Sequence, residues 1–305
     1  MAEIVVLGSL NIDLVARVPR FPAAGETLTG SDFKTVPGGK GANQAVAAAR
    51  LGASAAMVGR IGDDVFGGAL IEGMRKDGVD ADHVLVTPGA PTGTALITVD
   101  DRAENSIVII PGANGNLSPA DVDTWAGVIR GAKVLMLQLE VPLETVLRAA
   151  ETAKKAGVTV MLDPAPAREL PVELLRQVDI ITPNETEASI LTGRTVSDAR
   201  TAKLAAVDLL RTGVGAVLVK LGARGALVAA GNTFEHVDGF SVQAVDTTAA
   251  GDAFGGALAT ALVEGKSLQE AVVFANAAGA LATTRFGAQT SMPSRQEVEE
   301  FLRRQ

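Results

Sequence analysis

The chain has 305 residues, of which 47% are hydrophobic, so it can bury a large core and fits one large α/β domain or two small ones. Its formal charge of −8, from 27 basic and 35 acidic residues, gives no broad positive field for nucleic acid and no polybasic membrane anchor. Cysteine is absent and histidine occurs only at His83 and His236, which excludes disulfides, thiolate catalysis and cysteine-ligated zinc but leaves room for hard-cation sites built from oxygens.

The N-terminal segment Met-Ala-Glu-Ile-Val-Val-Leu-Gly lacks the basic residues and the long apolar run of a signal peptide, so we interpret it as the first strand of the fold. No stretch approaches the roughly 18 uninterrupted apolar residues that suggest a membrane span. We therefore expect a soluble, cytoplasmic protein that binds neither nucleic acid nor membrane.

Ile4 to Leu7 is a short apolar run that ends at Gly8, as expected of a strand buried on both faces of a parallel sheet. Asn11 and Asp13 follow its C-terminal end. Open α/β sheets bind ligands at the carboxyl ends of their strands, although Asn and Asp are also ordinary turn residues. The position makes both residues candidate ligand contacts.

Two stretches, Leu14 to Val36 and Thr92 to Ile110, alternate apolar and polar residues as β strands do. Prolines and charged residues interrupt the first stretch, which suits exposed edge strands better than a central sheet. We expect the two stretches to form one small sheet outside the main domain. Because a small exposed sheet is marginally stable alone, its apolar face needs cover from a ligand cleft or another subunit.

Between these stretches lies PGGKGANQA at residues 37 to 45, which leads into a predicted helix at Ala45 to Leu51. The glycines permit close backbone approach, and Lys40 and Asn43 supply donors for hydroxyl or phosphate oxygens. The segment matches neither the P-loop nor the dinucleotide-binding fingerprint. A glycine-rich helix start would explain it structurally, but the two donors together favour a ligand site.

Strand and helix patterns then alternate, which predicts a doubly wound, mostly parallel sheet with helices on both faces. The expected strands are Ala55 to Ile61, Val134 to Leu139, Val158 to Leu162, Ile180 to Thr182 and Val217 to Leu221. The expected helices are Val65 to Lys76, Ala120 to Ile129, Leu143 to Ala156, a helix that starts within 183–187 and runs through Leu191, and Leu268 to Leu281. We expect one unit over residues 1–305 with a discontinuous β appendage at about 14–36 and 92–110.

Acidic and amide residues follow several of these strands. Glu140 and Asp163 come directly after theirs, on the same sheet edge as Asn11, although Asp163, which precedes a proline, is equally well explained as a turn residue. Asn184 and Glu187 match a capping box at a helix start. Alternatively, they lie near phosphates, with Glu187 acting on Mg²⁺ through water.

Residues 246 to 252, DTTAAGD, join a predicted strand at Phe240 to Val245 to a predicted helix at Ala253 to Val263. The first N–H groups of a helix lack intrahelical partners and its dipole is positive there, so this turn, with Gly251, suits a transferring phosphoryl group. Asp252 beside that anion suggests a base that takes a proton from an attacking hydroxyl. Alternatively, Asp252 only stabilises the helix dipole.

Four segments occur in order and together resemble the ribokinase (PfkB-type) family of sugar kinases: PGGKGANQA at 37 to 45, TPNETEA at 182 to 188, KLGARG at 220 to 225 and DTTAAGD at 246 to 252. The resemblance covers essentially the whole chain. It implies a sheet with helices on both faces and a β lid through which two subunits form a homodimer.

The resemblance also assigns residues to ligands. The sugar contacts that it implies are Asn11, Asp13, Gly39, Lys40, Gly41, Asn43 and Glu140, with Asp252 as catalytic base. The nucleotide contacts are Asn184, Glu187, Lys220, Leu221, Gly222, Ala223, Arg224, Gly225, Gly251 and Asn276, and the anion hole is the turn Ala249, Ala250, Gly251 and Asp252. An activating monovalent cation, K⁺, would be held by Asp246, Thr248, Ala282, Arg285, Gly287 and Ser291.

This chain departs from the family pattern at two places. Many PfkB-type kinases have Gly-Ala-Gly-Asp where Ala249 to Asp252 stand, and Lys220 occupies a position often filled by Thr. The implied reaction is Mg²⁺-assisted transfer of the γ-phosphoryl group of ATP to the 5-hydroxyl of ribose, giving ribose 5-phosphate and ADP.

Other functions share parts of this pattern. A kinase for deoxyribose, fructose or a nucleoside such as adenosine is the nearest alternative, because one hydroxyl can decide acceptance. A dinucleotide-dependent oxidoreductase shares the α/β pattern, but its fingerprint is missing. A non-catalytic sugar-binding protein is disfavoured because Asp252 is intact.

Overall fold

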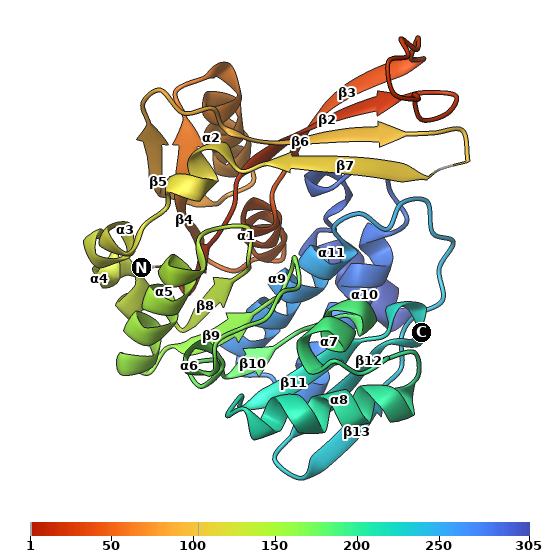
Figure 1. The fold of residues 1–305 in the computed structure, drawn as a ribbon. Coiled ribbons are helices and arrows are strands. Elements are labelled where there is room, and N and C mark those ends of the chain that lie inside the picture. Colours follow the sequence, from red (N-terminus) through yellow and green to blue (C-terminus); the bar gives the residue numbers. More distant parts are fainter. Residues whose placement is uncertain (1, 103) are drawn as a thin grey trace.

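The structure, a computed structural model, describes residues 2–102 and 104–305, and nine strands within these ranges form the main sheet (Figure 1). Their spatial order is β13 (Thr233–Val237), β12 (Ala226–Ala230), β11 (Ala216–Lys220), β10 (Ile180–Ile181), β9 (Thr159–Leu162), β8 (Val134–Leu137), β1 (Ile4–Leu7), β4 (Ala55–Gly62) and β5 (Asp80–Thr87). All neighbours from β11 to β5 are parallel, and β12 and β13 form an antiparallel edge. The chain builds outward from β1 in both directions, which is the doubly wound order.

Helices pack on both faces of this sheet. One face is covered by α1 (Lys40–Arg50), α2 (Val65–Lys76), α9 (Ala250–Val263), α10 (Leu268–Ala282) and α11 (Arg295–Arg303). The other is covered by α3 (Pro119–Thr124), α4 (Ala126–Gly131), α5 (Leu143–Lys155), α6 (Val172–Leu175), α7 (Glu185–Thr192) and α8 (Ala199–Arg211). Short 3-10 turns are η1 (Gly112–Asn116), η2 (Gly222–Arg224) and η3 (Gln289–Ser291). In the part of the chain that the structure describes, no helix is long and apolar enough to cross a membrane.

The central strands are apolar without interruption because both of their faces are buried. In β1, Ile4 and Val6 point into the core under one helical layer, whereas Val5 and Leu7 point into the core under the other. All four side chains are fully buried. Each such side chain contributes about 1.5–3 kcal/mol of hydrophobic stabilisation. The predicted fold class, a doubly wound sheet with helices on both faces, is confirmed.

A second, four-stranded sheet projects from the main body, at the top of Figure 1. Its order is β3 (Asp32–Gly38), β2 (Asn11–Arg17), β6 (Gly93–Val99) and β7 (Asn105–Ile110). β2 pairs antiparallel with β3 and parallel with β6, and β7 pairs antiparallel with β6. The strands come from the two stretches in which the sequence predicts a separate small sheet.

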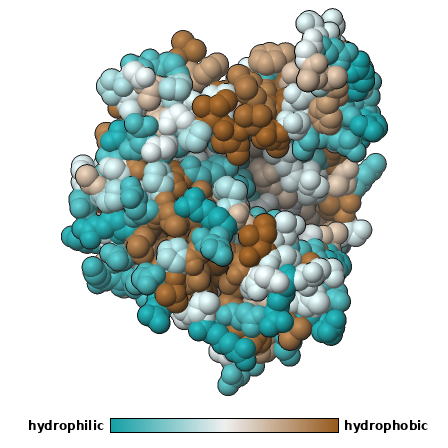
Figure 2. Space-filling view, in the orientation of Figure 1, coloured by the Kyte–Doolittle hydropathy of each residue, from teal (hydrophilic) through white to brown (hydrophobic). Residues whose placement is uncertain are grey.

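The small sheet exposes many apolar side chains. Every residue of β7 is exposed, and Figure 2 shows a brown patch over this part of the molecule. The large apolar side chains involved are Phe33, Leu96, Ile107, Val108, Ile109 and Ile110, which are 38–62% exposed. A surface of this kind is typical of an interaction site.

The predicted strand at Phe240 to Val245 is wrong. The segment forms no strand in the structure but crosses from the end of β13 to the start of α9. Its alternating apolar residues have other partners: Phe240 packs edge-on against Phe301 of α11, and Val242 lines a cavity. The apolar side chains of this alternating segment therefore contact a helix and a cavity, and the segment has no neighbouring strand to pair with among the described residues.

Two helices differ in extent from the prediction. The helix expected at Ala120 to Ile129 is broken at Trp125, which ends α3 and precedes α4 with a backbone that is not helical. Helix α1 begins at Lys40, before the expected Ala45, because Gly39 adopts a φ of +88° and turns the chain into the helix. Lys40 and Asn43 are thus fixed on the first turn of a helix.

Candidate active site

The carboxyl ends of the central strands meet at one edge of the main sheet, and polar residues gather there. Those that follow or end successive strands are Asn11, Glu140, Asp163, Asn184 and Lys220. The first turn of α9 lies opposite, since Asp163, Lys220 and Asp252 line the same cavity. The structure therefore brings the separate sequence motifs into one site.

The start of α9 is suited to an anion. Ala249, which precedes the helix, has a φ of +59° and is the one residue other than glycine with a left-handed backbone among the described residues. This conformation costs roughly 1–2 kcal/mol for alanine. No described side chain caps the helix start. The N–H of Ala250 donates to the carbonyl of Thr247 at 3.3 Å, and the N–H groups of Gly251 and Asp252, which follow it, face a ligand in the cavity.

Asp252 lies in the first turn of α9 and its side chain is buried. The Nδ2 atom of Asn43 donates to its Oδ2 atom at 2.9 Å, and the Nε2 atom of Gln44 donates to its Oδ1 atom at 3.1 Å. Burial raises the pKa of Asp252, Asp163 adds to this effect, and Lys40 and the two amides oppose it. A carboxylate with a raised pKa at the mouth of an anion site has the properties of a general base.

Lys40 provides the positive charge at the centre of the site. Burial alone would lower its pKa, but the surrounding carboxylates outweigh burial and hold the pKa above its usual value. These carboxylates belong to Asp252, Asp163, Glu140 and Glu187. Lys40 is therefore protonated and balances a site that is otherwise strongly acidic.

The residues that the resemblance assigns to the sugar lie near Lys40 and Asp252, on the side that faces the small sheet. Burial, with the charges of Glu140 and Asp252, raises the pKa of Asp13 to about 7. The Oε2 atom of Glu140 accepts from the backbone N–H of Lys40 at 3.2 Å. A side chain on Gly39 would meet the backbone of Asn11 at 2.6 Å, so this close approach requires glycine.

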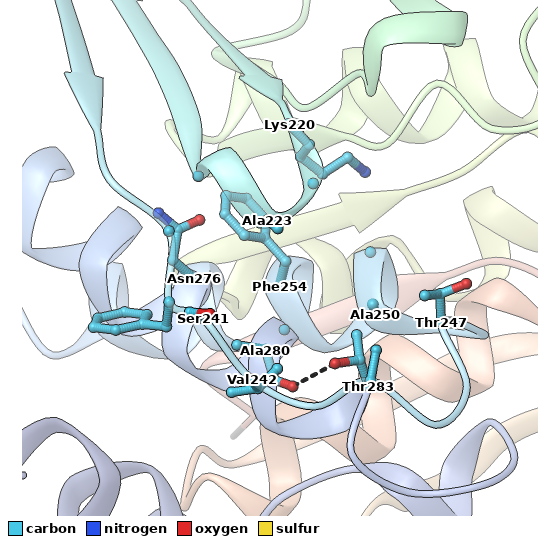
Figure 3. Close-up of a pocket in the computed structure, with 17 residues that line it drawn as sticks. Lys220, Ala223, Ser241, Val242, Thr247, Ala250, Phe254, Asn276, Ala280 and Thr283 are labelled. Atoms are coloured by element: carbon cyan, nitrogen blue, oxygen red, sulfur yellow. Dashed lines mark hydrogen bonds between the residues drawn. The ribbon is translucent and has the colours of Figure 1, made fainter. Parts of the chain in front are cut away.

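A cavity of about 300 Å³ lies between the η2 turn, the 239–247 segment and helices α9 and α10 (Figure 3). Asn276 and Ser241 stand at one end of it, and Lys220 and Thr247 stand at the other. Most of its lining is apolar. It meets a second, polar cavity of about 430 Å³ at Lys220 and Gly251. Together they form a trough with one apolar end and one charged end, which matches the base and the phosphates of a nucleotide.

The predicted nucleotide residues divide between the two cavities. The apolar cavity is lined by Lys220, Gly222, Ala223, Gly225, Ala250, Gly251 and Asn276. The polar cavity is lined by Lys40, Asn184, Glu187, Lys220, Gly222, Ala249, Gly251 and Asp252. Leu221 and Arg224 have other contacts: the side chain of Leu221 packs in the core, and Arg224 pairs with Glu185.

Asn184 and Glu187 form the predicted capping box of α7. The Oε2 atom of Glu187 accepts from the backbone N–H of Asn184 at 2.7 Å, and its Oε1 atom accepts from Nδ2 of Asn184 at 2.9 Å. Both residues also line the polar cavity. The structural and the ligand interpretations are therefore compatible, because each carboxylate oxygen can accept more than one hydrogen bond.

Of the residues assigned to a monovalent cation, Asp246 and Thr248 lie just before the start of α9, and Ala282, Arg285, Gly287 and Ser291 lie at and after the end of α10. Asp246 accepts from the backbone N–H of Thr248 and from that of Gly287, both at 2.9 Å. Burial alone would raise the pKa of Asp246, but hydrogen bonds from Thr248 and Gly287 outweigh burial and lower it. Asp246 thus holds an ionised carboxylate between the 246–248 turn and the loop that contains Gly287 and Ser291.

Four polar side chains of the site were not assigned a role from the sequence. Gln44 and Gln138 are fully buried behind Asp252, and Asp163 pairs with Lys220 at 2.9 Å between Oδ1 and Nζ. Asn114 is buried in η1 and donates to the side chain of Asn11 at 2.7 Å. For Gln44 the sequence did contain a signal: it forms, with Asn43, a pair of consecutive amides in an otherwise alanine-rich apolar helix.

The model of the pfkB family of carbohydrate kinases matches residues 1–295. The chain is 49% identical to ribokinase from Haemophilus influenzae, with 97% of each chain covered, and 41% identical to deoxyribokinase from Salmonella typhi, with 98% of each covered. The structure of Arabidopsis thaliana ribokinase complexed with ribose and ATP is 38% identical and matches with a TM-score of 0.94 over 99% of this chain and 98% of that chain. The protein is therefore a carbohydrate kinase and belongs to the pfkB family.

Proposed function

We propose that this protein transfers the γ-phosphoryl group of ATP to the 5-hydroxyl of D-ribose. The observation that carries the proposal is Asp252, a buried carboxylate with a raised pKa at the uncapped start of α9, where a polar cavity meets an apolar one. The similarity to ribokinases over nearly the whole chain supports ribose as the acceptor. A kinase works where ATP is supplied, so the cytoplasm is the expected compartment.

Asp252 acts as the general base in this proposal. Its carboxylate takes the proton of the 5-hydroxyl as that oxygen bonds to the γ-phosphorus. The bond between the γ-phosphorus and the β–γ bridging oxygen breaks, and ADP leaves with the electron pair. The N–H groups of the turn formed by Ala249, Ala250 and Gly251 stabilise the charge on the transferring group.

The remaining residues bind and orient the two substrates. We assign the sugar to Asn11, Asp13, Gly39, Lys40, Gly41, Asn43 and Glu140, which meet near Asp252. We assign the nucleotide to Asn184, Glu187, Lys220, Gly222, Ala223, Gly225, Gly251 and Asn276, which line the two cavities, and leave Leu221 and Arg224 out because their side chains have other partners. We also assign the small sheet, predicted over about 14–36 and 92–110, as a lid of the single domain 1–305. The interaction of Asp13, on its strand β2, with Glu140 and Asp252 supports this assignment.

The polar cavity fits Mg²⁺ bound with the nucleotide. Mg²⁺ keeps several water ligands and uses few protein carboxylates, and Glu187 offers one carboxylate whose oxygens have spare acceptor capacity. Bound Mg²⁺ neutralises phosphate charge during transfer. Glu187 and Asn184 would hold its water ligands, and Lys40 and Lys220 would face the phosphate oxygens.

An acceptor panel tests the proposal. We expect ATP-dependent turnover with ribose, 2-deoxyribose, fructose and adenosine to give the highest kcat/KM for ribose. A kcat/KM at least tenfold higher for 2-deoxyribose or for another acceptor would assign the protein to a different kinase of the same family. No turnover with any acceptor would favour a sugar-binding protein.

We further propose that K⁺ activates the enzyme. The site would use the carboxylate of Asp246, the carbonyls of Thr248, Ala282, Arg285 and Gly287, and Ser291. A large, weakly hydrated cation suits such a set of oxygens. Because Asp246 and Thr248 begin the turn that leads into α9, a fixed 246–248 turn would order the anion hole before ATP binds.

Replacement of K⁺ by a bulky organic cation at constant ionic strength should therefore lower the rate of phosphorylation. The Asp246→Ala variant should lose the difference between the two salts, whereas Asp82→Ala, an exposed carboxylate on β5, should keep it. Equal wild-type rates in both salts would show that no such site operates.

The lid also carries a proposed dimer interface. The exposed apolar side chains of β7 lie on both faces of the lid, and another lid would cover one of these faces in a homodimer. We expect sedimentation to give a dimer at micromolar concentration. Ile107 and Val108 point to opposite faces of β7, so at least one of Ile107→Glu and Val108→Glu should give a monomer.

Leu204→Glu, at an exposed apolar residue of α8, is the control and should stay dimeric. A wild-type monomer at micromolar concentration, or dimers of both β7 variants, would rule out this interface.

A further inference from the structure

Two buried amide side chains stand behind the carboxylate of Asp252. Gln44 lies on α1 and is 1% exposed, and Gln138 follows β8 and is 0% exposed. The Nε2 atom of Gln44 donates to Oδ1 of Asp252 and to Oδ2 of Asp163, both at 3.1 Å. Gln138 donates from its Nε2 atom to Oε1 of Gln44 at 2.6 Å. The amides thus form a short chain that ends on two carboxylates.

The orientation of this chain is determined by its chemistry. Two carboxylate oxygens accept only, so the end of Gln44 that faces them is its NH₂ group. Its Oε1 atom then faces Gln138, which is compelled to present its own NH₂ group. The Oε1 atom of Gln138 lies against Gly8, where an added Cβ would be 1.9 Å away, and it has no hydrogen-bond partner among the described residues. Gly8 therefore leaves the space that the Gln138 amide occupies.

We propose that Gln44 is a positioning residue for Asp252 and that Gln138 holds the amide of Gln44 in the required orientation. The proposal rests on the role of Asp252 as the base. Asn43 holds one oxygen of that carboxylate and Gln44 holds the other, so the rotation of the carboxylate about its terminal bond is fixed. Terminal torsions of this type are otherwise broad.

The charges around Asp252 explain why its carboxylate needs hydrogen bonds that fix its orientation. Lys40 from α1 attracts the carboxylate, whereas Asp163 after β9 and Asp13 from the small sheet repel it. Gln44 is a neutral donor shared by Asp252 and Asp163, so it separates these two carboxylates while binding both. Asp163 is also held by Lys220, which faces the nucleotide cavity. The hydrogen bond from Gln44 counters the raised pKa of Asp252.

Gln44→Met keeps the length of the side chain and removes its donor. We expect kcat to fall by about 10- to 100-fold, with little change in the KM for sugar or ATP, because a misdirected base lowers the chemical step. The acid limb of the kcat profile should move to higher pH, since the lost donor no longer stabilises the ionised carboxylate. Gln138→Met should also lower kcat and move the acid limb to higher pH, but both effects should be smaller than those of Gln44→Met.

Thr260→Val is the matched control, because Thr260 lies on the same helix as Asp252, is buried and loses one hydrogen bond, that to the carbonyl of Gly256. It should leave kcat and the acid limb unchanged. Thermal melting and ATP binding identify any variant that fails to fold. If Gln44→Met does not fold, Gln44→Glu replaces it as the test. Glutamate has the same shape as glutamine but adds a negative charge beside Asp252. The acid limb of the kcat profile should therefore move to higher pH by more than the loss of the donor alone would cause.

A Gln44 variant with kcat within about twofold of wild type, or with lower kcat and an unmoved acid limb, would overturn the proposal. This failure is distinct from failure of the proposed function. The wild-type enzyme is tested first for turnover, and Asp252→Asn tests the base separately.

Discussion

Asp252→Asn should lower kcat for ribose by about 10²- to 10⁴-fold while sugar and nucleotide binding stay close to wild type, which is the usual effect of removing a positioned base. Asparagine has the same shape but cannot take the hydroxyl proton. The substitution turns one acceptor oxygen into an NH₂ group, and Asn43, whose Oδ1 atom has no hydrogen-bond partner among the described residues, can turn its amide to accept from that group, so the fold should tolerate the change. The measurement is steady-state kinetics together with calorimetric titration of ATP.

Asp123→Asn is the control for this substitution, because Asp123 is an exposed carboxylate on α3 that pairs with Arg148. It should keep full activity. If Asp252→Asn turns over within a few-fold of wild type and binds both substrates, Asp252 serves only the helix dipole.

Lys40→Met should lower kcat/KM by about 10²- to 10³-fold, because it removes one of the two lysines, Lys40 and Lys220, from a site with four carboxylates and phosphate oxygens. The same change should lower the melting temperature at pH 8 more than at pH 5. The pKa of Asp13 is about 7 in the fold and that of Asp252 is also raised, so both carboxyls repel their neighbours only once they ionise. Their destabilising contribution is absent below the unfolded pKa of roughly 4 and grows as the pH rises through the folded pKa.

Lys76→Met provides the comparison, since Lys76 is an exposed lysine that pairs with Glu72 on α2. It should change neither activity nor the pH dependence of melting. A Lys40→Met enzyme that melts with the wild-type pH dependence would show that Lys40 does not balance these carboxylates.

The fold class could be predicted from the sequence because every central strand is a short, uninterrupted apolar run. Ile4 to Leu7 and Val134 to Leu137 are apolar on both faces, and only a sheet between two helical layers buries both. The small sheet was predicted from alternation of residues in two separated stretches. Phe240 to Val245 carries the same alternation but lies where no strand is available for pairing, a fact that depends on tertiary structure.

The sequence indicates a candidate site where one segment contains all of the residue types that the chemistry requires. DTTAAGD at 246 to 252 combines a turn, a helix start and a carboxylate within seven residues, so its placement needed no distant partner. Gln44, Gln138 and the ion pair of Asp163 with Lys220 depend on contacts between elements far apart in the chain. No local pattern distinguishes these side chains from ordinary polar residues.

The position of the phosphoryl group on the product tests the central claim most directly. Wild-type protein would be incubated with ATP, Mg²⁺ and ribose labelled with ¹³C, and the product examined by ¹³C and ³¹P nuclear magnetic resonance. The proposed reaction predicts coupling of phosphorus to carbon 5 and equimolar ADP. ATP hydrolysis without a sugar phosphate, or a phosphoryl group on another carbon, would contradict it.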